Sequence, residues 1–167
     1  WSGDCGRRCR RAFFPAVTEV MPSEVLDYWF APGMADHWFR STPTLDEEVG
    51  ARFETLWRRG RDGGLLHWED TAEGALALVI LLDQFPLNMF RNQPDSFSTE
   101  ASARAVAERA IDRGLDRDLH GQQLAFLYLP FMHSEDLADQ ERSVRLFEAA
   151  GLTDNLRFAR HHRDIVA

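Results

Sequence analysis

The first side chains that could do chemistry follow directly on the most apolar stretch of the sequence. The run Ala75–Leu82 is apolar on all sides, and Asp83 comes immediately after it. A carboxylate at the edge of a buried helix is costly unless it is paired or hydrated through a cavity. One interpretation is structural, with Asp83 in a buried ion pair with Arg91 or a more distant arginine. The other places Asp83 in a pocket wall as an acid, a base or a ligand anchor. Gln84, Asn88 and Arg91 are then expected to bind the ligand.

A second polar group is the run of four residues that begins at His133, directly after the apolar stretch Tyr128–Met132. Capping explains part of it, because Ser134 or Asp136 can accept bonds from the free backbone N–H groups of the next helix. Capping does not explain His133 and Glu135. A histidine beside a carboxylate can move protons near neutral pH. We therefore predict catalytic roles for His133 and Glu135 and ligand-binding roles for Ser134 and Asp136.

A third group, Arg160–Asp164, lies in the last predicted helix. His161 and His162 point about 100° apart on a helix, so they do not form a chelating pair. His162 lies three residues from both Ala159 and Ile165, and this spacing favours an inward position. We therefore add His162 to the candidate acid–base set.

Metal ligation has little support in the sequence. No two histidines stand four residues apart, and Cys5 and Cys9 have no partners at zinc-ligand spacing. We predict neither a metal nor a cofactor. Trp38, beside His37, is typical of a core or lid aromatic, and we place it among the ligand-contacting side chains.

The length, charge and composition of the sequence exclude several classes of partner and reaction. The 167 residues correspond to one domain, and a hydrophobic share of 44% is ordinary for a globular protein. The net charge of −8 argues against nucleic acid or an anionic membrane as a partner. All 19 basic residues are arginine, which excludes a Schiff-base or P-loop lysine.

The charge is unevenly spread, because residues 1–17 carry +3 and the rest carries −11. The segment Arg10–Phe14 resembles a twin-arginine export signal, but the apolar region that must follow is interrupted. We expect residues 1–20 to be a basic extension outside the fold and residues 21–167 to form a single helical domain. No apolar run approaches the roughly 18 residues of a membrane span. The expected location is therefore the cytoplasm.

Apolar residues at helical spacing predict an all-α fold. Ser23 and Thr71 are the predicted caps of the first and third helices, and Pro86 ends or kinks the third. Short loops between the helices favour antiparallel helical hairpins, whereas no fixed-period repeat is visible. The seven predicted helices cover residues 23–30, 45–60, 71–82, 98–111, 122–132, 136–150 and 154–166.

Four segments together resemble the bacterial domain-of-unknown-function family nine-two-four, within the tetratricopeptide-like helical superfamily. The resemblance covers residues 21–167 and implies a tetratricopeptide-like hairpin array whose motif residues gather in a groove, without implying a reaction. The family usually has arginine at the position of Leu87. Its pattern continues past Ile165 into a basic, aromatic Phe-Pro-His-Arg-Asn stretch, so we expect an altered function if that stretch closes the pocket. The four segments are Val25–Phe30, His37–Phe39, Leu82–Arg91 and Leu127–Asp136.

Two function classes remain open on the sequence. In the first, the protein is an enzyme with a small-molecule pocket, and the reaction we predict is hydrolysis of a small ester or phosphoester. Asp83 and His133 should then line one cavity, with Arg91 as an anion anchor. In the second, the hairpins form an acidic, non-catalytic groove that binds a basic peptide or a cationic small molecule.

Overall fold

The computed structural model describes residues 19–167, and over these residues the fold is all-α, without a strand. Most of the predicted extension, including Cys5 and Cys9, lies outside the described residues. Of its last two positions, Val20 packs against the core and Glu19 lies 3.4 Å from His67. Contacts with the helical domain therefore reach at least two residues upstream of Met21.

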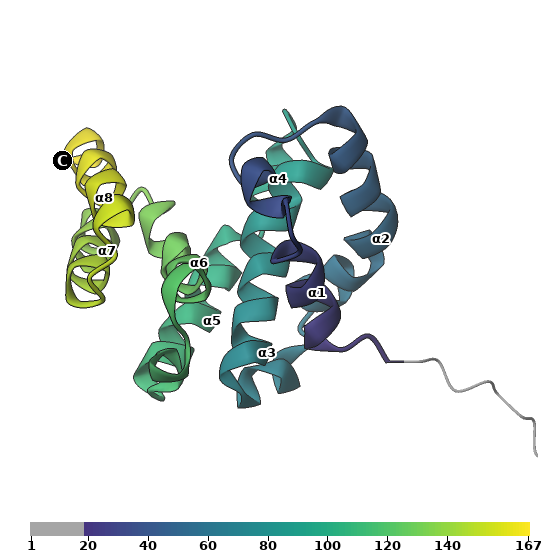
Figure 1. Ribbon diagram of the computed structural model, residues 1–167, viewed down its shortest axis with the longest axis horizontal. Helices are drawn as coiled ribbons and strands as arrows, with labels where there is room; N and C mark the ends of the chain where they lie inside the picture. Colours follow the sequence, from purple (N-terminus) through teal and green to yellow (C-terminus); the bar gives the residue numbers. More distant parts are fainter. Residues whose placement is uncertain (1–18) are drawn as a thin grey trace, which may run out of the picture.

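The helices follow the predicted order, and α3 and α4 are joined by the π-helical turn η3 into one continuous rod (Figure 1). With that rod counted once, residues 19–167 contain the predicted seven helices. Their bounds are α1 (Pro22–Trp29), α2 (Pro43–Arg61), α3 (Ala72–Val79), η3 (Ile80–Gln84), α4 (Phe85–Met89), α5 (Glu100–Asp112), α6 (Gly121–Met132), α7 (Leu137–Ala149) and α8 (Thr153–Val166). Short 3₁₀ turns lie between them at η1 (Met34–His37), η2 (Leu66–Asp70), η4 (Pro94–Phe97) and η5 (Leu115–Asp118).

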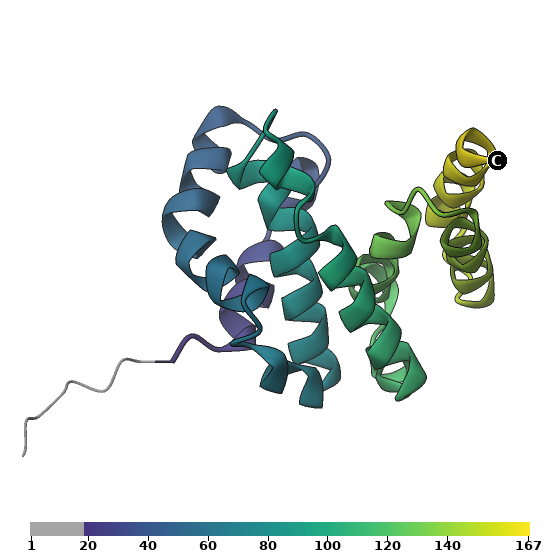
Figure 2. The same cartoon turned by 180° about the vertical axis from the view of Figure 1, so that it is seen from behind.

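The helices form three groups along the long axis, as Figures 1 and 2 show from opposite sides. Helices α1–α4 lie at one end, α5 and α6 in the middle, and the hairpin α7–α8 at the other end. Helix α3 packs against α1, α5 and α6, which explains why its apolar residues cover its whole circumference. An aromatic cluster joins α1, α4 and α6, with the Trp29 ring 5.5 Å from Phe85 and 5.7 Å from Phe126.

Two predicted caps have different outcomes. The Thr71 prediction is confirmed, because its Oγ1 accepts a hydrogen bond from Gly74 N at 3.0 Å. The Ser23 prediction is wrong, because α1 begins at Pro22 and Ser23 lies inside it. Pro22 suits the first helical position, where its missing N–H is not needed. The Met21 N–H donates instead to the Glu24 carboxylate at 3.2 Å.

The π turn η3 explains how the helix passes Pro86. Phe85 N–H donates to the Ile80 carbonyl five residues back, rather than four. Pro86 has no N–H for the Leu82 carbonyl, and that carbonyl accepts the Thr99 hydroxyl at 2.6 Å. Pro86 therefore does not end the helix, and the Leu82 carbonyl has a partner from another segment. The wider turn carries Asp83 and Gln84, and such turns are frequent at functional sites.

The continuous rod corrects the prediction about membrane spans. Because the helix does not stop at Pro86, the 18-residue stretch Ala72–Met89 is long and apolar enough to cross a membrane. However, 83% of that stretch is buried inside the fold. A central core helix has the same length and composition, and this helix is packed on several sides by its neighbours.

Candidate functional site

The centre of the candidate site is a pair formed by Asp83 in η3 and His133 at the end of α6. His133 Nδ1 lies 2.9 Å from Asp83 Oδ1. The Asp83 side chain is completely buried, whereas the His133 side chain is 24% exposed. Asp83 therefore lies beneath the histidine rather than in a cavity wall. Its predicted ion pair with Arg91 is wrong, because its charged partner is an imidazole.

Gln84 completes the surroundings of the buried carboxylate. Its Nε2 donates to Asp83 Oδ2 at 2.6 Å, so both carboxylate oxygens have a partner. Burial by itself lowers the pKa of His133, but the charges of Asp83 and Glu100 and the hydrogen bond to Asp83 raise it above its ordinary value. The buried carboxylate on one edge of the imidazole thus raises its pKa, while part of the ring remains accessible.

Four cavities meet at His133, and we call their union the His133 cleft. The acidic cavity (about 610 Å³) borders Glu100, and the aromatic cavity (about 460 Å³) borders Phe158. The C-terminal cavity (about 330 Å³) borders Ile165, and the arginine cavity (about 240 Å³) borders Arg91. His133 lines all four. Every other predicted site residue except Asp83 lines at least one: Trp38, Gln84, Asn88, Arg91, Ser134, Glu135, Asp136 and His162.

Arg91 and Asn88 belong to a structural network around Asp46. Arg91 donates to both Asp46 oxygens, at 2.6 and 3.0 Å, and Asn88 Nδ2 donates to Asp46 Oδ1 at 2.9 Å. Although burial opposes it, hydrogen bonds from Arg91, Ser41 and Asn88 keep the pKa of Asp46 below its ordinary range. Arg91 is therefore not a free anion anchor, as the sequence suggested. It closes one side of the cleft by joining α4 to α2.

Ser134 and Asp136 divide the capping role expected of them. Asp136 is the N-cap of α7 and accepts from Ala138 N at 2.7 Å. The Ser134 hydroxyl donates to Asp139 at 2.7 Å and accepts from the Asp136 backbone N–H. Both side chains also line the acidic cavity, while Glu135 is exposed there.

The cap leads to a direct prediction for Asp136→Ala. Because the variant leaves the first N–H groups of α7 without their acceptor, we expect a loss of about 1 kcal/mol in the free energy of unfolding. Urea denaturation followed by circular dichroism measures it. A matched control is Asp154→Ala, since Asp154 is exposed in the first turn of α8 and forms no cap bond there. Equal losses in the two variants would contradict the cap assignment.

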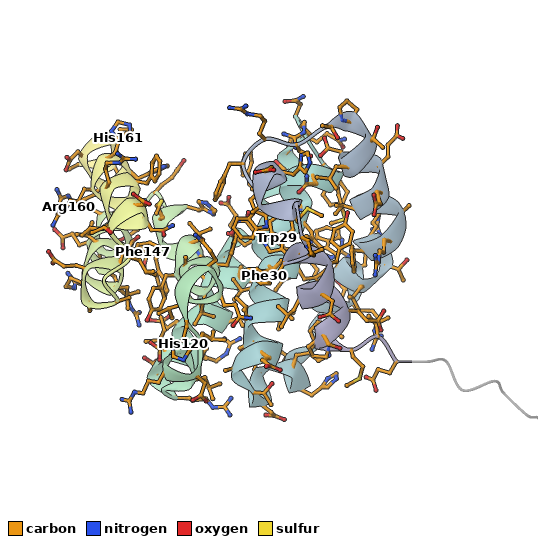
Figure 3. All side chains as sticks on the ribbon, in the orientation of Figure 1. Trp29, Phe30, His120, Phe147, Arg160 and His161 are labelled. Carbon is orange, nitrogen blue, oxygen red and sulfur yellow. The ribbon has the colours of Figure 1, made fainter. Side chains whose placement is uncertain are left out.

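The two adjacent histidines of α8 lie on different sides of the helix. His162 lines both the aromatic and the C-terminal cavity, whereas His161 lines neither. Figure 3 shows His161 and Arg160 on the outer side of α8. Burial and the charges of His133 and His161 lower the pKa of His162. His162 therefore meets a ligand in its neutral form more readily than His133 does.

Aromatic side chains line the aromatic cavity of the cleft. Trp38 is half-buried, and its Nε1 donates to the Trp29 carbonyl at 2.9 Å, which fixes the indole in place. Phe39 is 76% exposed and Phe158 is 52% exposed, although both border the aromatic cavity. Phe39 stacks on Phe126, and the Arg157 guanidinium lies 5.3 Å from the Phe158 ring centroid. The rest of each ring is exposed apolar surface.

Several residues of the cleft were not identified from the sequence. Glu100 lies in the first turn of α5, a position that the sequence explains equally well as a helix-stabilising acid. Phe97, Phe39 and Phe158 resemble core residues by type. Asp46 lies in the first turn of α2, 45 residues before Arg91. No local pattern signals that it pairs with that arginine.

The polar side chains of the cleft differ in whether they are already engaged by a partner. Within residues 19–167, no three side chains of His, Cys, Asp and Glu gather as a metal site would require. The two serines that line the cleft are engaged. The Ser41 hydroxyl donates to Asp46 at 2.7 Å, and that of Ser134 donates to Asp139. Of the two histidines that line the cleft, His133 is the one whose ring is held by a buried carboxylate.

Comparison with known proteins is consistent with this fold and assigns no activity. No curated protein matches the chain. A solved structure, that of the protein of unknown function ATU0120 from Agrobacterium tumefaciens, is 38% identical, with a TM-score of 0.81. The match covers 87% of this chain and 81% of that one. The profile of DUF924, described as a bacterial protein of unknown function, matches residues 25–167. The chain therefore belongs to the DUF924 family of bacterial proteins.

Proposed function

We propose that this protein binds a small molecule in the His133 cleft and that the Asp83–His133 pair acts on it as a general acid–base. The observation that carries the proposal is the position of His133 between a completely buried carboxylate and the meeting point of four cavities. A carboxylate on Nδ1 fixes the imidazole and stabilises its charged form, which leaves Nε2 to exchange a proton with the ligand.

Hydrolysis by an activated water is the simplest reaction for this arrangement. Among the described residues, no serine or threonine hydroxyl is hydrogen-bonded to His133. A covalent nucleophile of the serine–histidine kind therefore lacks its base. His133 Nε2 would instead remove a proton from a water molecule. The water oxygen would attack the carbonyl carbon of an ester or the phosphorus of a phosphoester, and the imidazolium would give the proton to the leaving group. Glu135 and His162 would border the same reaction space.

The test measures hydrolysis of a panel of 4-nitrophenyl carboxylic esters and phosphoesters by the purified wild type, His133→Gln and His161→Gln. We expect kcat/KM to fall by roughly 100-fold or more in His133→Gln, the typical value of a general base. His161→Gln is the matched control, because His161 lies outside the cleft on the same helix as His162. Hydrolysis that is equal in all three proteins, or absent from the whole panel, would contradict the hydrolytic assignment.

A non-catalytic groove for a basic peptide is the second candidate. It is supported by the exposed rings of Phe39 and Phe158 in the aromatic cavity, which meets the acidic cavity at His133. The two functions differ in their need for Asp83. A peptide groove should keep its affinity in Asp83→Asn, whereas the acid–base function should be lost.

A further inference from the structure

We infer that the ligand of the His133 cleft is a small organic cation, an amine or guanidine that carries an aromatic or other apolar group. This inference rests on the proposed function and names its substrate class. In this arrangement the cationic end lies in the acidic cavity near Glu100 and Glu135. The apolar end passes His133 and covers the exposed rings of the aromatic cavity.

The balance of paired and unpaired charges around the cleft favours a cationic ligand. Its two arginines already hold carboxylates: Arg91 binds Asp46 at 2.6 Å, and Arg104 binds Asp139 at 3.1 Å. Over residues 19–167, no ion pair or side-chain hydrogen bond engages Glu100 or Glu135. The charges left for a ligand to neutralise are therefore negative on the acidic side.

Glu100 is the better placed of the two carboxylates. It is partly buried and borders both the acidic and the C-terminal cavity, in each case together with His133. Burial raises the pKa of Glu100 above its ordinary value. The charge of His133 offsets part of this rise, and the charge of Asp83 adds to it. An ammonium or guanidinium group beside it would relieve this penalty, whereas an anion would add to it.

Exposed aromatic side chains lie along the same path and favour a ligand with an apolar group. Phe97 is 59% exposed and borders the acidic cavity together with Glu100, so a cation there meets an aromatic ring as well as a carboxylate. Phe39 and Phe158 continue this surface on the other side of His133. Exposed apolar side chains that gather at a concave surface are typical of ligand grooves. The unpaired carboxylates and the exposed aromatic rings together therefore favour a cation that carries an apolar group.

His133 lies between the expected positions of the cationic end and the apolar end of the ligand. The acidic and C-terminal cavities share Glu100, and the C-terminal and aromatic cavities share His162. A ligand that spans them presents its middle atoms to His133 Nε2. The reacting bond is thus expected between the cationic group and the apolar group.

The experiment compares 3-phenylpropylamine with 3-phenylpropanoate, which have nearly the same size and opposite charge. Each is titrated into the full chain at pH 7.5 while the ring signals of His133 are followed by NMR, with His133→Gln used for assignment. We expect the amine to shift these signals with a dissociation constant on the order of 1 mM, as suits a fragment of this size. The anion should bind at least tenfold more weakly.

Two variants test the role of Glu100. Glu100→Gln should weaken amine binding by roughly fivefold to tenfold, the usual effect of losing a charge-assisted bond. Glu73→Gln, in the first turn of α3 and outside the four cavities, should leave it unchanged. Circular dichroism confirms that both variants are folded.

The outcomes separate this inference from the proposed function. Stronger or equal binding of the anion, or an unchanged affinity in Glu100→Gln, overturns the cationic class while leaving a small-molecule site at His133. If neither compound perturbs His133, the small-molecule site itself is overturned. If only an arginine-rich peptide perturbs His133, the groove binds peptides, and this inference is wrong.

Discussion

Asp83→Asn is expected to destabilise the fold by about 3 kcal/mol, because it removes one partner of a buried charged pair. The Asp83 side chain is completely buried, so no water can replace its bond to His133. The loss stays near the lower end of the usual range because His133, which is partly exposed, can release its proton. Urea denaturation measures the effect, and an unchanged midpoint would contradict the pairing.

The pH dependence of this loss gives a second readout. The folded pKa of His133 is raised, so the pair stabilises the fold fully below the unfolded histidine value of about 6.5. That contribution disappears as the pH rises through the folded pKa. The difference in unfolding free energy between wild type and Asp83→Asn should therefore be larger at pH 6 than at pH 9. A difference that grows toward pH 9 would mean that the charge of His133 is not stabilised by Asp83.

Gly74→Ala is expected to destabilise the fold by about 3 kcal/mol for a purely steric reason. A Cβ at position 74 would lie 2.0 Å from the Trp68 carbonyl oxygen and 2.9 Å from Thr71 Oγ1. The first of these is a backbone atom of η2, so the clash cannot be relieved by turning a side chain. Helix α3 would have to move away from η2 at its first turn. We expect the melting temperature to fall by roughly 6–12 °C in calorimetry.

Gly50→Ala is the matched control for this prediction. Gly50 lies in the middle of α2, and a Cβ there would meet nothing within 4 Å beyond its chain neighbours and the backbone of its own helix. Because alanine loses less backbone entropy than glycine in a helix, this variant should be more stable by about 0.5–1 kcal/mol. If both glycine variants changed stability by the same amount and in the same direction, helix propensity would explain the result and the close approach of α3 to η2 would not.

The helices could be predicted because each one has an apolar face that repeats at helical spacing. The same pattern marked Asp83 and His133, since both follow directly on apolar runs that had to be buried. Local pattern could not predict the path at Pro86. A proline there predicts that the helix ends or kinks, whereas the π turn lets it continue and the Thr99 hydroxyl pairs the Leu82 carbonyl.

Partners that lie far apart in the sequence were the main source of error in the site. Asp83 and His133 are 50 residues apart, and Arg91 and Asp46 are 45 apart. Helical periodicity shows which face of a helix is buried, but it does not show which side chain of another helix lies opposite. For the same reason Glu100 could not be recognised as part of the cleft, although the helix that carries it was predicted.

The most direct test of this account is the position of the proton on neutral His133. An ionised carboxylate can only accept a hydrogen bond, so Asp83 requires the proton on Nδ1 and leaves Nε2 bare toward the cleft. We would record ¹⁵N NMR spectra of the histidine rings of the folded wild type above the raised pKa of His133. The account predicts a protonated Nδ1 in the wild type and loss of this preference in Asp83→Asn. A protonated Nε2 and a bare Nδ1 in the wild type would contradict it.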